Sequence, residues 1–92
     1  MASDPLLDAT RALVERVAGP SRTPEDSGPE TPLSAEGFWL DSVELLELVV
    51  ACETEFNIMF DATTDLTGGT FETLGALTER IREKRSHDHT RP

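Results

Sequence analysis

The chain has 92 residues, and its 18 acidic residues against 8 Lys and Arg give a formal net charge of −10 at pH 7. This length suits one small domain with a modest core. The charge argues against nucleic acid and anionic membranes as partners and favours basic protein surfaces reached by electrostatic steering. The single cysteine, Cys52, excludes an internal disulfide. We find no secretory leader and no apolar run of membrane length, so we expect a cytoplasmic protein, and we expect it to be a monomer.

The first predicted helix starts at Asp4-Pro5, a good N-cap and N1 pair, and ends at Gly19-Pro20. Residues at helical spacing give this helix one face to bury: Leu6, Thr10, Leu13, Val14 and Val17. A long loop should follow, because four prolines block regular structure in the next stretch of the chain. We expect the loop to return to the core at Pro32-Leu33 and at Gly37-Phe38.

The strongest amphipathic pattern of the chain runs from residue 42 to residue 56. Apolar residues at helical spacing predict the buried face of a helix: Leu45, Leu48, Val49, Cys52 and Phe56. Asp41 as N-cap and Glu44 at N3 form a variant of the capping box. Ser42 then lies in the first turn with an exposed hydroxyl, either as a simple helix-start residue or as a site where an attached anion is tolerated. Roughly opposite the buried face, a second row of residues at helical spacing consists of Val43, Glu47, Val50 and Thr54. This row is either an ordinary solvated face or a docking surface for a partner.

Beyond Phe56 the sequence predicts a short helix over residues 61–66 and a last helix after the break at Thr67-Gly68-Gly69. Thr70 is the predicted cap of the last helix. Its apolar positions are Phe71, Leu74, Leu77 and Ile81. We expect the folded domain to cover residues 1–85 and residues 86–92 to form a disordered C-terminal tail.

Asp41-Ser42-Val43 and the acidic, apolar stretch to Phe56 resemble the Asp-Ser-Leu motif and second helix of acyl carrier proteins. The resemblance runs from about Pro32 to Ile81. It implies an all-α fold, a four-helix bundle with a long loop between helices 1 and 2 and a short third helix. It also implies that Ser42 carries covalent 4′-phosphopantetheine, and that the chain has no catalytic residues and no metal.

The same resemblance implies how the protein meets its partners. Asp41, Glu44 and Glu47 correspond to recognition acids, and the remaining members of the docking surface are Val43, Val50 and Thr54. The implied partners are a phosphopantetheinyl transferase and an acyltransferase, a ketosynthase or an acyl-loading ligase. The pattern Leu66-Thr67, Phe71 and Thr73-Leu74 resembles free-standing carriers of polyketide and related natural-product pathways more than it resembles fatty-acid carriers.

One departure from the family lies just before the serine. Trp39 stands where related sequences commonly have Gly, and the span from Gly37 to Asp41 is one residue longer than usual. We expect one of the two aromatic residues, Phe38 or Trp39, to fill core space and the other to lie near the prosthetic arm.

Three other functions remain open. A peptidyl carrier protein has the same prosthetic chemistry, and an acidic helical adaptor would have no arm. The third is a degenerate EF-hand calcium module, although Leu66 stands where the EF-hand loop needs Gly. The residues at its ligand positions are Asp61, Thr63, Asp65, Thr67, Gly69 and Glu72. We expect His87 and His89 to belong to the tail, and no nucleophile, base and oxyanion arrangement can be assembled.

Overall fold

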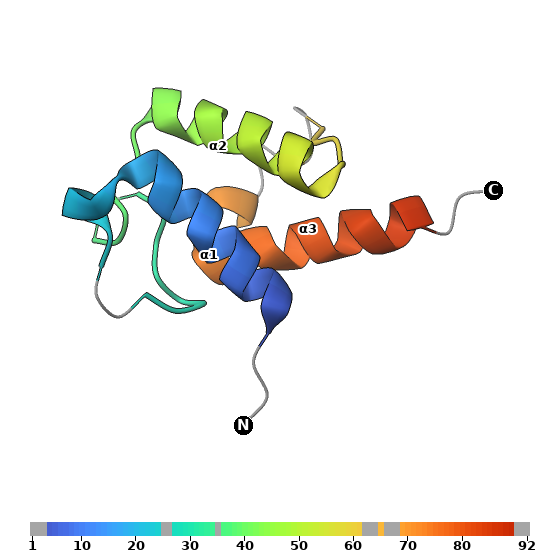
Figure 1. Ribbon diagram of the computed structural model, residues 1–92, viewed down its shortest axis with the longest axis horizontal. Helices are drawn as coiled ribbons and strands as arrows, with labels where there is room; N and C mark the ends of the chain where they lie inside the picture. The colour runs from blue at the N-terminus through green and yellow to red at the C-terminus, as the bar shows by residue number, and fades with distance from the viewer. Residues whose placement is uncertain (1–3, 25–26, 35, 62–64, 66–68, 90–92) are drawn as a thin grey trace.

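The computed structural model describes residues 4–24, 27–34, 36–61, 65 and 69–89. These residues form three α-helices and two short 3-10 helices without any named strand (Figure 1): α1 (Pro5–Ala18), η1 (Pro20–Arg22), α2 (Ser42–Phe56), η2 (Gly69–Phe71) and α3 (Leu74–His89). The all-α prediction is therefore confirmed. The predicted short helix over residues 61–66 falls mostly outside the described residues, so the fourth helix stays a prediction. Across the described part of the chain, none of the helices has the length and apolar character needed to cross a membrane.

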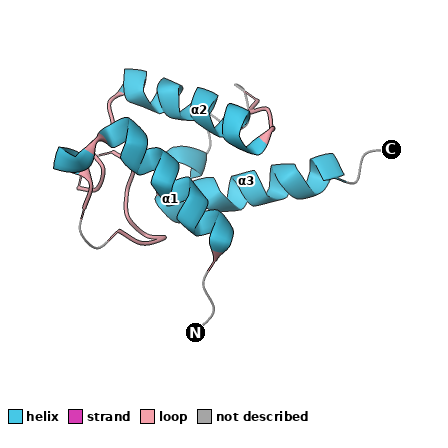
Figure 2. Cartoon of the chain, in the orientation of Figure 1, coloured by secondary structure: helices cyan, strands magenta, loops and turns pink. Residues whose placement is uncertain are grey.

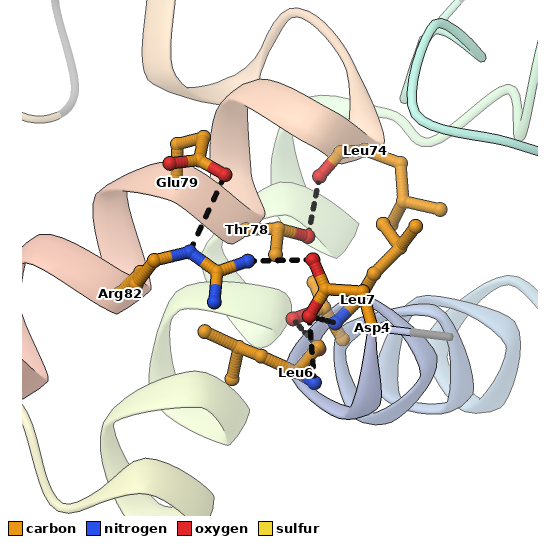
Figure 3. Close-up of polar contacts among 8 residues, drawn as sticks. Asp4, Leu6, Leu7, Leu74, Thr78, Glu79 and Arg82 are labelled. Carbon is orange, nitrogen blue, oxygen red and sulfur yellow. Dashed lines mark hydrogen bonds and ion pairs between the residues drawn. The ribbon is translucent and has the colours of Figure 1, made fainter. Parts of the chain in front are cut away.

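The start of α1 is tied to α3 by one carboxylate. Asp4 caps α1 as predicted, because its Oδ1 accepts hydrogen bonds from the amides of Leu6 (3.2 Å) and Leu7 (3.3 Å). Its Oδ2 lies 2.6 Å from Nη2 of Arg82, whose Nε is 3.4 Å from Oε2 of Glu79 (Figure 3). Asp4 therefore stabilises both the first turn of α1 and the contact of α1 with α3.

The core lies between the three α-helices, with α1 packed against both α2 and α3. Its buried apolar side chains come from the three α-helices, from the loop before α2 and from the segment after it: Leu6, Leu13, Val14, Ala18, Leu33, Phe38, Leu40, Leu48, Cys52, Ile58, Leu74, Leu77 and Ile81. Two of the buried threonines lie within the α-helices, and each hydroxyl donates a hydrogen bond of 2.8 Å back along its own helix. Thr10 donates to the carbonyl of Leu6 and Thr78 to that of Leu74. These hydroxyls are satisfied locally, so they can lie in the core at little cost.

The last helix differs from its prediction at both ends. It begins at Leu74, and the hydroxyl of Thr73 accepts a hydrogen bond from the amide of Ala76 at 3.1 Å, so the predicted cap at Thr70 is wrong. Thr70 is instead buried within η2. At the other end α3 continues through residues 86–89, which the sequence placed in a disordered tail. No Gly or Pro interrupts the chain there before Pro92, so nothing in the sequence stops the helix.

Apart from η1, the described chain between α1 and α2 is loop (Figure 2). Residues 29–33 of this loop pair with the beginning of α3. The amide of Leu33 donates to the carbonyl of Glu72 (3.1 Å), and the amide of Leu74 donates to that of Thr31 (3.0 Å). The amide of Gly75 likewise reaches the carbonyl of Pro29 at 2.7 Å. The first turn of α3 and Glu72 just before it are therefore fixed to the loop by three backbone hydrogen bonds.

The same loop segment also pairs with the residues that lead into α2. The amide of Phe38 donates to the carbonyl of Pro32 (3.0 Å), and the amide of Leu40 donates to the carbonyl of Leu33 (2.9 Å). Leu33 and Phe38 are fully buried, as the sequence predicts for the points where the loop returns to the core. At Gly37 the backbone approaches Pro32 so closely that an added Cβ would lie 1.8 Å from the Pro32 carbonyl oxygen. A glycine is required there, because no other residue leaves room for this contact.

Candidate functional site

The first turn of α2 is held by a reciprocal pair of hydrogen bonds. Oδ1 of Asp41 accepts from the amide of Glu44 at 2.8 Å, and Oε1 of Glu44 accepts from the amide of Asp41 at 3.0 Å. This is the capping box that the sequence predicts, and such a cap contributes about 1 kcal/mol to helix stability. Ser42 is the first residue of α2 and is exposed. Its hydroxyl takes no part in the box, so a group attached to it leaves the cap intact.

Ser42 is positioned by the buried residues on either side of it. Leu40, two residues earlier, is buried and hydrogen-bonded to the loop through its amide. Leu48, within α2, is fully buried, as is Cys52 one turn later. Leu45 and Phe56 pack against this core while partly buried. The predicted buried face of α2 is confirmed at these positions, and Val49 is partly exposed at its margin.

The opposite side of α2 carries exposed apolar side chains among acids. Val43 is 63% exposed and Val50 is 61% exposed, and Glu47 and Thr54 of the same predicted row are also exposed. The structure adds Leu46, 58% exposed, which the sequence analysis did not single out. The sequence signal that identifies Leu46 as part of this surface is its spacing, three residues after Val43 and four before Val50. We call Val43, Leu46, Glu47, Val50 and Thr54 the outer face of α2.

The electrostatic environment of Ser42 is acidic. Asp41 precedes it, and Glu44 and Glu47 follow at intervals of two and five residues. The sequence has no Lys or Arg between Arg22 and Arg80, so α2 and the segments that flank it contain no cationic side chain. This surface will attract basic groups of a partner and repel anions that are not specifically held.

Phe38 and Trp39 lie in different environments, as the sequence predicts, because one fills core space and the other does not. Phe38 is fully buried, whereas Trp39 is 56% exposed. The backbone of Trp39 has a φ of 58°, in the left-handed region that favours glycine, and its amide donates to the carbonyl of Ser34 at 2.9 Å. An exposed indole therefore lies three residues before Ser42. The expectation that it lies near a prosthetic arm stays a prediction.

Asp65, a predicted calcium ligand in the EF-hand interpretation, is committed to other partners. Its side chain is only 2% exposed, with Oδ2 at 2.6 Å from Nζ of Lys84 and Oδ1 at 3.2 Å from Nε of Arg80. Burial acts to raise the pKa of this carboxyl, but the hydrogen bond from the Asp61 amide and the two cations outweigh it and hold the pKa below its ordinary value. Two cations at the carboxylate would repel Ca²⁺. Asp65 therefore joins the segment after α2 to α3.

The other predicted calcium ligands and the tail histidines give no site in the structure. Thr63 and Thr67, like Leu66 between them, lie outside the described residues, and so do the side chains of His87 and His89. Elsewhere in the described chain, no group of three or more His, Cys, Asp and Glu side chains is placed to hold a metal ion.

A small helical bundle with an exposed serine at the start of a capped acidic helix has the architecture of a carrier domain, which presents an attached group and does no chemistry of its own. A family model described as "Phosphopantetheine attachment site" matches residues 8–81. The chain belongs to this family of non-catalytic carrier domains, to which 4′-phosphopantetheine is covalently attached. Neither the curated proteins nor the solved structures gave a significant match to the chain.

Proposed function

We propose that the chain is an acyl carrier protein and that Ser42 is the residue to which 4′-phosphopantetheine is attached. The observation that carries the proposal is the placement of Ser42, exposed at the first position of α2 and directly after the N-cap Asp41. Its neighbours are fixed by the capping box and by Leu40, so the hydroxyl is presented from a rigid helix start. An enzyme that modifies it meets a preorganised nucleophile.

The residues around Ser42 suit a phosphodiester-linked arm. The exposed hydroxyl leaves room for a long substituent, and the positive end of the α2 dipole favours the phosphate charge. Attachment joins the Ser42 oxygen to the β-phosphorus of coenzyme A, releases adenosine 3′,5′-bisphosphate and passes the hydroxyl proton to the transferase. When bound, the group supplies a terminal thiol that holds acyl groups as thioesters.

Partner recognition in this proposal rests on the acids around Ser42 and on the outer face of α2. Asp41, Glu44 and Glu47 would meet Lys and Arg of the partner, and exposed pairs of this kind contribute about 0 to 1 kcal/mol each. Val43, Leu46 and Val50 would supply apolar contact, with Thr54 at the far end. Docking should therefore be transient and weakened by salt, which suits a monomeric cytoplasmic carrier that visits a phosphopantetheinyl transferase and then several pathway enzymes.

An acyl cargo is favoured over a peptidyl cargo by the residues before the serine. Leu40-Asp41 precedes Ser42, whereas Gly and His more often precede the serine of peptidyl carriers. We propose an acyltransferase, a ketosynthase or an acyl-loading ligase as the enzymes that load or use the carrier. We assign it to a polyketide or related natural-product pathway on the resemblance around Phe71 and Thr73-Leu74.

The test is intact-mass analysis of the purified chain before and after incubation with a broad-specificity phosphopantetheinyl transferase, coenzyme A and Mg²⁺. We expect a gain of one phosphopantetheine on the peptide that contains Ser42, and no gain in Ser42→Ala. Ser34→Ala, which removes another exposed hydroxyl, is the matched control and should be modified like the wild type. A folded, unmodified wild-type chain that gains no mass would overturn the proposal and favour an acidic adaptor without an arm.

A further inference from the structure

The side chain of Trp39 is presented to solvent by a rigid backbone. Its two neighbours in sequence, Phe38 and Leu40, are both buried, and both are hydrogen-bonded through their amides to residues 32–33. The amide of Trp39 donates to the carbonyl of Ser34. The indole is 56% exposed although it is the largest apolar side chain of the protein. The fold thus fixes the backbone of Trp39 while leaving most of its side chain in water.

The conformation of Trp39 has a cost in the free protein. A non-glycine residue in the left-handed region is about 1 to 2 kcal/mol less favourable than in the right-handed region, and Trp39 has a φ of 58°. Exposing an indole forgoes the burial that usually stabilises a large aromatic side chain. Strained residues persist where the surroundings hold them in place, and they are concentrated at functional sites. The location of this one, three residues before Ser42, points to a role in what approaches the serine.

We infer that Trp39 is an anchor residue for the phosphopantetheinyl transferase, inserted into an apolar pocket that the transferase presents beside its own active site. This inference rests on the proposed attachment of the arm to Ser42. The transferase acts on the Ser42 oxygen itself, so its surface must cover the residues around that oxygen. Enzymes that act on the far end of the arm can remain further from Trp39, and for them this contact is not compulsory.

The chemistry of the surface around Trp39 defines the pocket that would receive it. Val43, 63% exposed on the first turn of α2, extends the apolar surface beyond the serine, while Glu36 and Asp41 are exposed acids close in sequence to the indole. The complementary pocket is therefore apolar at its base and has Arg or Lys at its rim, where a guanidinium can stack on the indole face. Tryptophan is one of the residues enriched at binding hot spots, and a backbone that is already fixed lowers the entropy lost on docking.

The kinetic test measures phosphopantetheinylation by the same broad-specificity transferase over a range of carrier concentrations. For Trp39→Ala we expect KM to rise about thirtyfold or more with kcat nearly unchanged, which is the loss expected when one hot-spot side chain is removed. Trp39→Phe should recover most of the loss, because it restores an aromatic ring. Met59→Ala is the matched control, since Met59 is an exposed apolar residue beyond the other end of α2, and its KM should equal that of the wild type.

The single tryptophan allows a direct measurement as well. The chain has one Trp, so labelling with 5-fluorotryptophan gives one fluorine resonance, that of Trp39. On titration with unlabelled transferase we expect this resonance to shift, and a solvent-isotope effect on its position should disappear as the ring leaves water. An unchanged KM in Trp39→Ala, or a resonance that stays solvent-exposed at saturation, would overturn the anchor role. Wild-type modification at Ser42 is scored separately, so that failure of the anchor is not confused with failure of the attachment site.

Discussion

Gly37 makes the closest backbone contact in the loop that leads to Ser42, and its replacement by alanine tests whether that contact positions the loop. The new Cβ would lie 1.8 Å from the carbonyl oxygen of Pro32, 2.7 Å from its carbonyl carbon and 3.0 Å from its nitrogen. All three are backbone atoms, so no rotation of a side chain can relieve the overlap. Pro32 cannot retreat easily either, because it forms a bridge with Thr73 on its other side.

The cost of Gly37→Ala follows from the contacts that must open. Separating residue 37 from Pro32 breaks the hydrogen bond from the Phe38 amide to the Pro32 carbonyl and strains the bond from the Leu40 amide to Leu33. Each such bond contributes about 1 kcal/mol, and partial exposure of the buried Phe38 ring adds to the loss. We expect a decrease of about 2 to 4 kcal/mol in the free energy of unfolding, a large part of the stability of a small domain.

Urea unfolding followed by circular dichroism measures this loss, with Gly28→Ala as the matched control. A Cβ at Gly28 would meet only the Glu30 side chain, at 3.4 Å, which can move. Gly28→Ala should therefore change stability by less than about 0.5 kcal/mol. We also expect Gly37→Ala to slow modification of Ser42, because the segment that leads into α2 shifts. A Gly37→Ala protein as stable as Gly28→Ala would refute the assignment of Pro32 and Gly37 as a tight backbone contact.

Two further predictions concern buried groups away from Ser42. Asp65→Asn should lower the free energy of unfolding by about 2 kcal/mol at pH 7, less than the full cost of breaking a buried ion pair because Arg80 and Lys84 are partly exposed. The pKa of Asp65 is lowered in the folded state, so its contribution is complete above its ordinary pKa and is lost as pH falls through the lowered value. The difference between the two proteins in urea unfolding should therefore shrink as pH falls below the ordinary pKa of aspartate. A difference that does not shrink on acidification would exclude the ion pairs as its cause. Burial raises the pKa of the Cys52 thiol to about 12. A thiol reagent at pH 8 should therefore react with the attached arm, and with Cys52 only when the protein unfolds. Rapid labelling of the folded, arm-free chain would contradict this.

Local signals in the sequence predicted the features that depend on neighbouring residues. The capping box needs only Asp41 and Glu44, and the buried face of α2 follows from the spacing of Leu48 and Cys52, so both were predictable. The choice of Phe38 for the core and Trp39 for the surface was not, because it depends on the unusual φ of Trp39. Contacts between distant segments left no local signal at all.

The ends of α3 and the role of Asp65 show the same limit. Thr70 and Thr73 are equally good caps by residue type, and the pairing of the loop with the first turn of α3 decides for Thr73. Asp65 matched an EF-hand position by its oxygen atoms, but two cations from α3 neutralise it in the folded chain. Residue type and spacing therefore predict local geometry, whereas the partner of a buried charge depends on how the chain folds back on itself.

The uneven distribution of cations has a consequence for how the protein approaches a basic partner. Arg80, Arg82 and Lys84 of α3 lie against acids of their own surroundings, while α2 contains five acids, counting its N-cap, and no Lys or Arg. The acids of α2 are consequently left without a cation on their own helix or on the segments that flank it. A basic partner is attracted most strongly when it faces these acids, so fewer encounters begin with Ser42 facing away. At physiological ionic strength this attraction acts only over about 8 Å, so added salt should lower the fraction of productive encounters as well as their number.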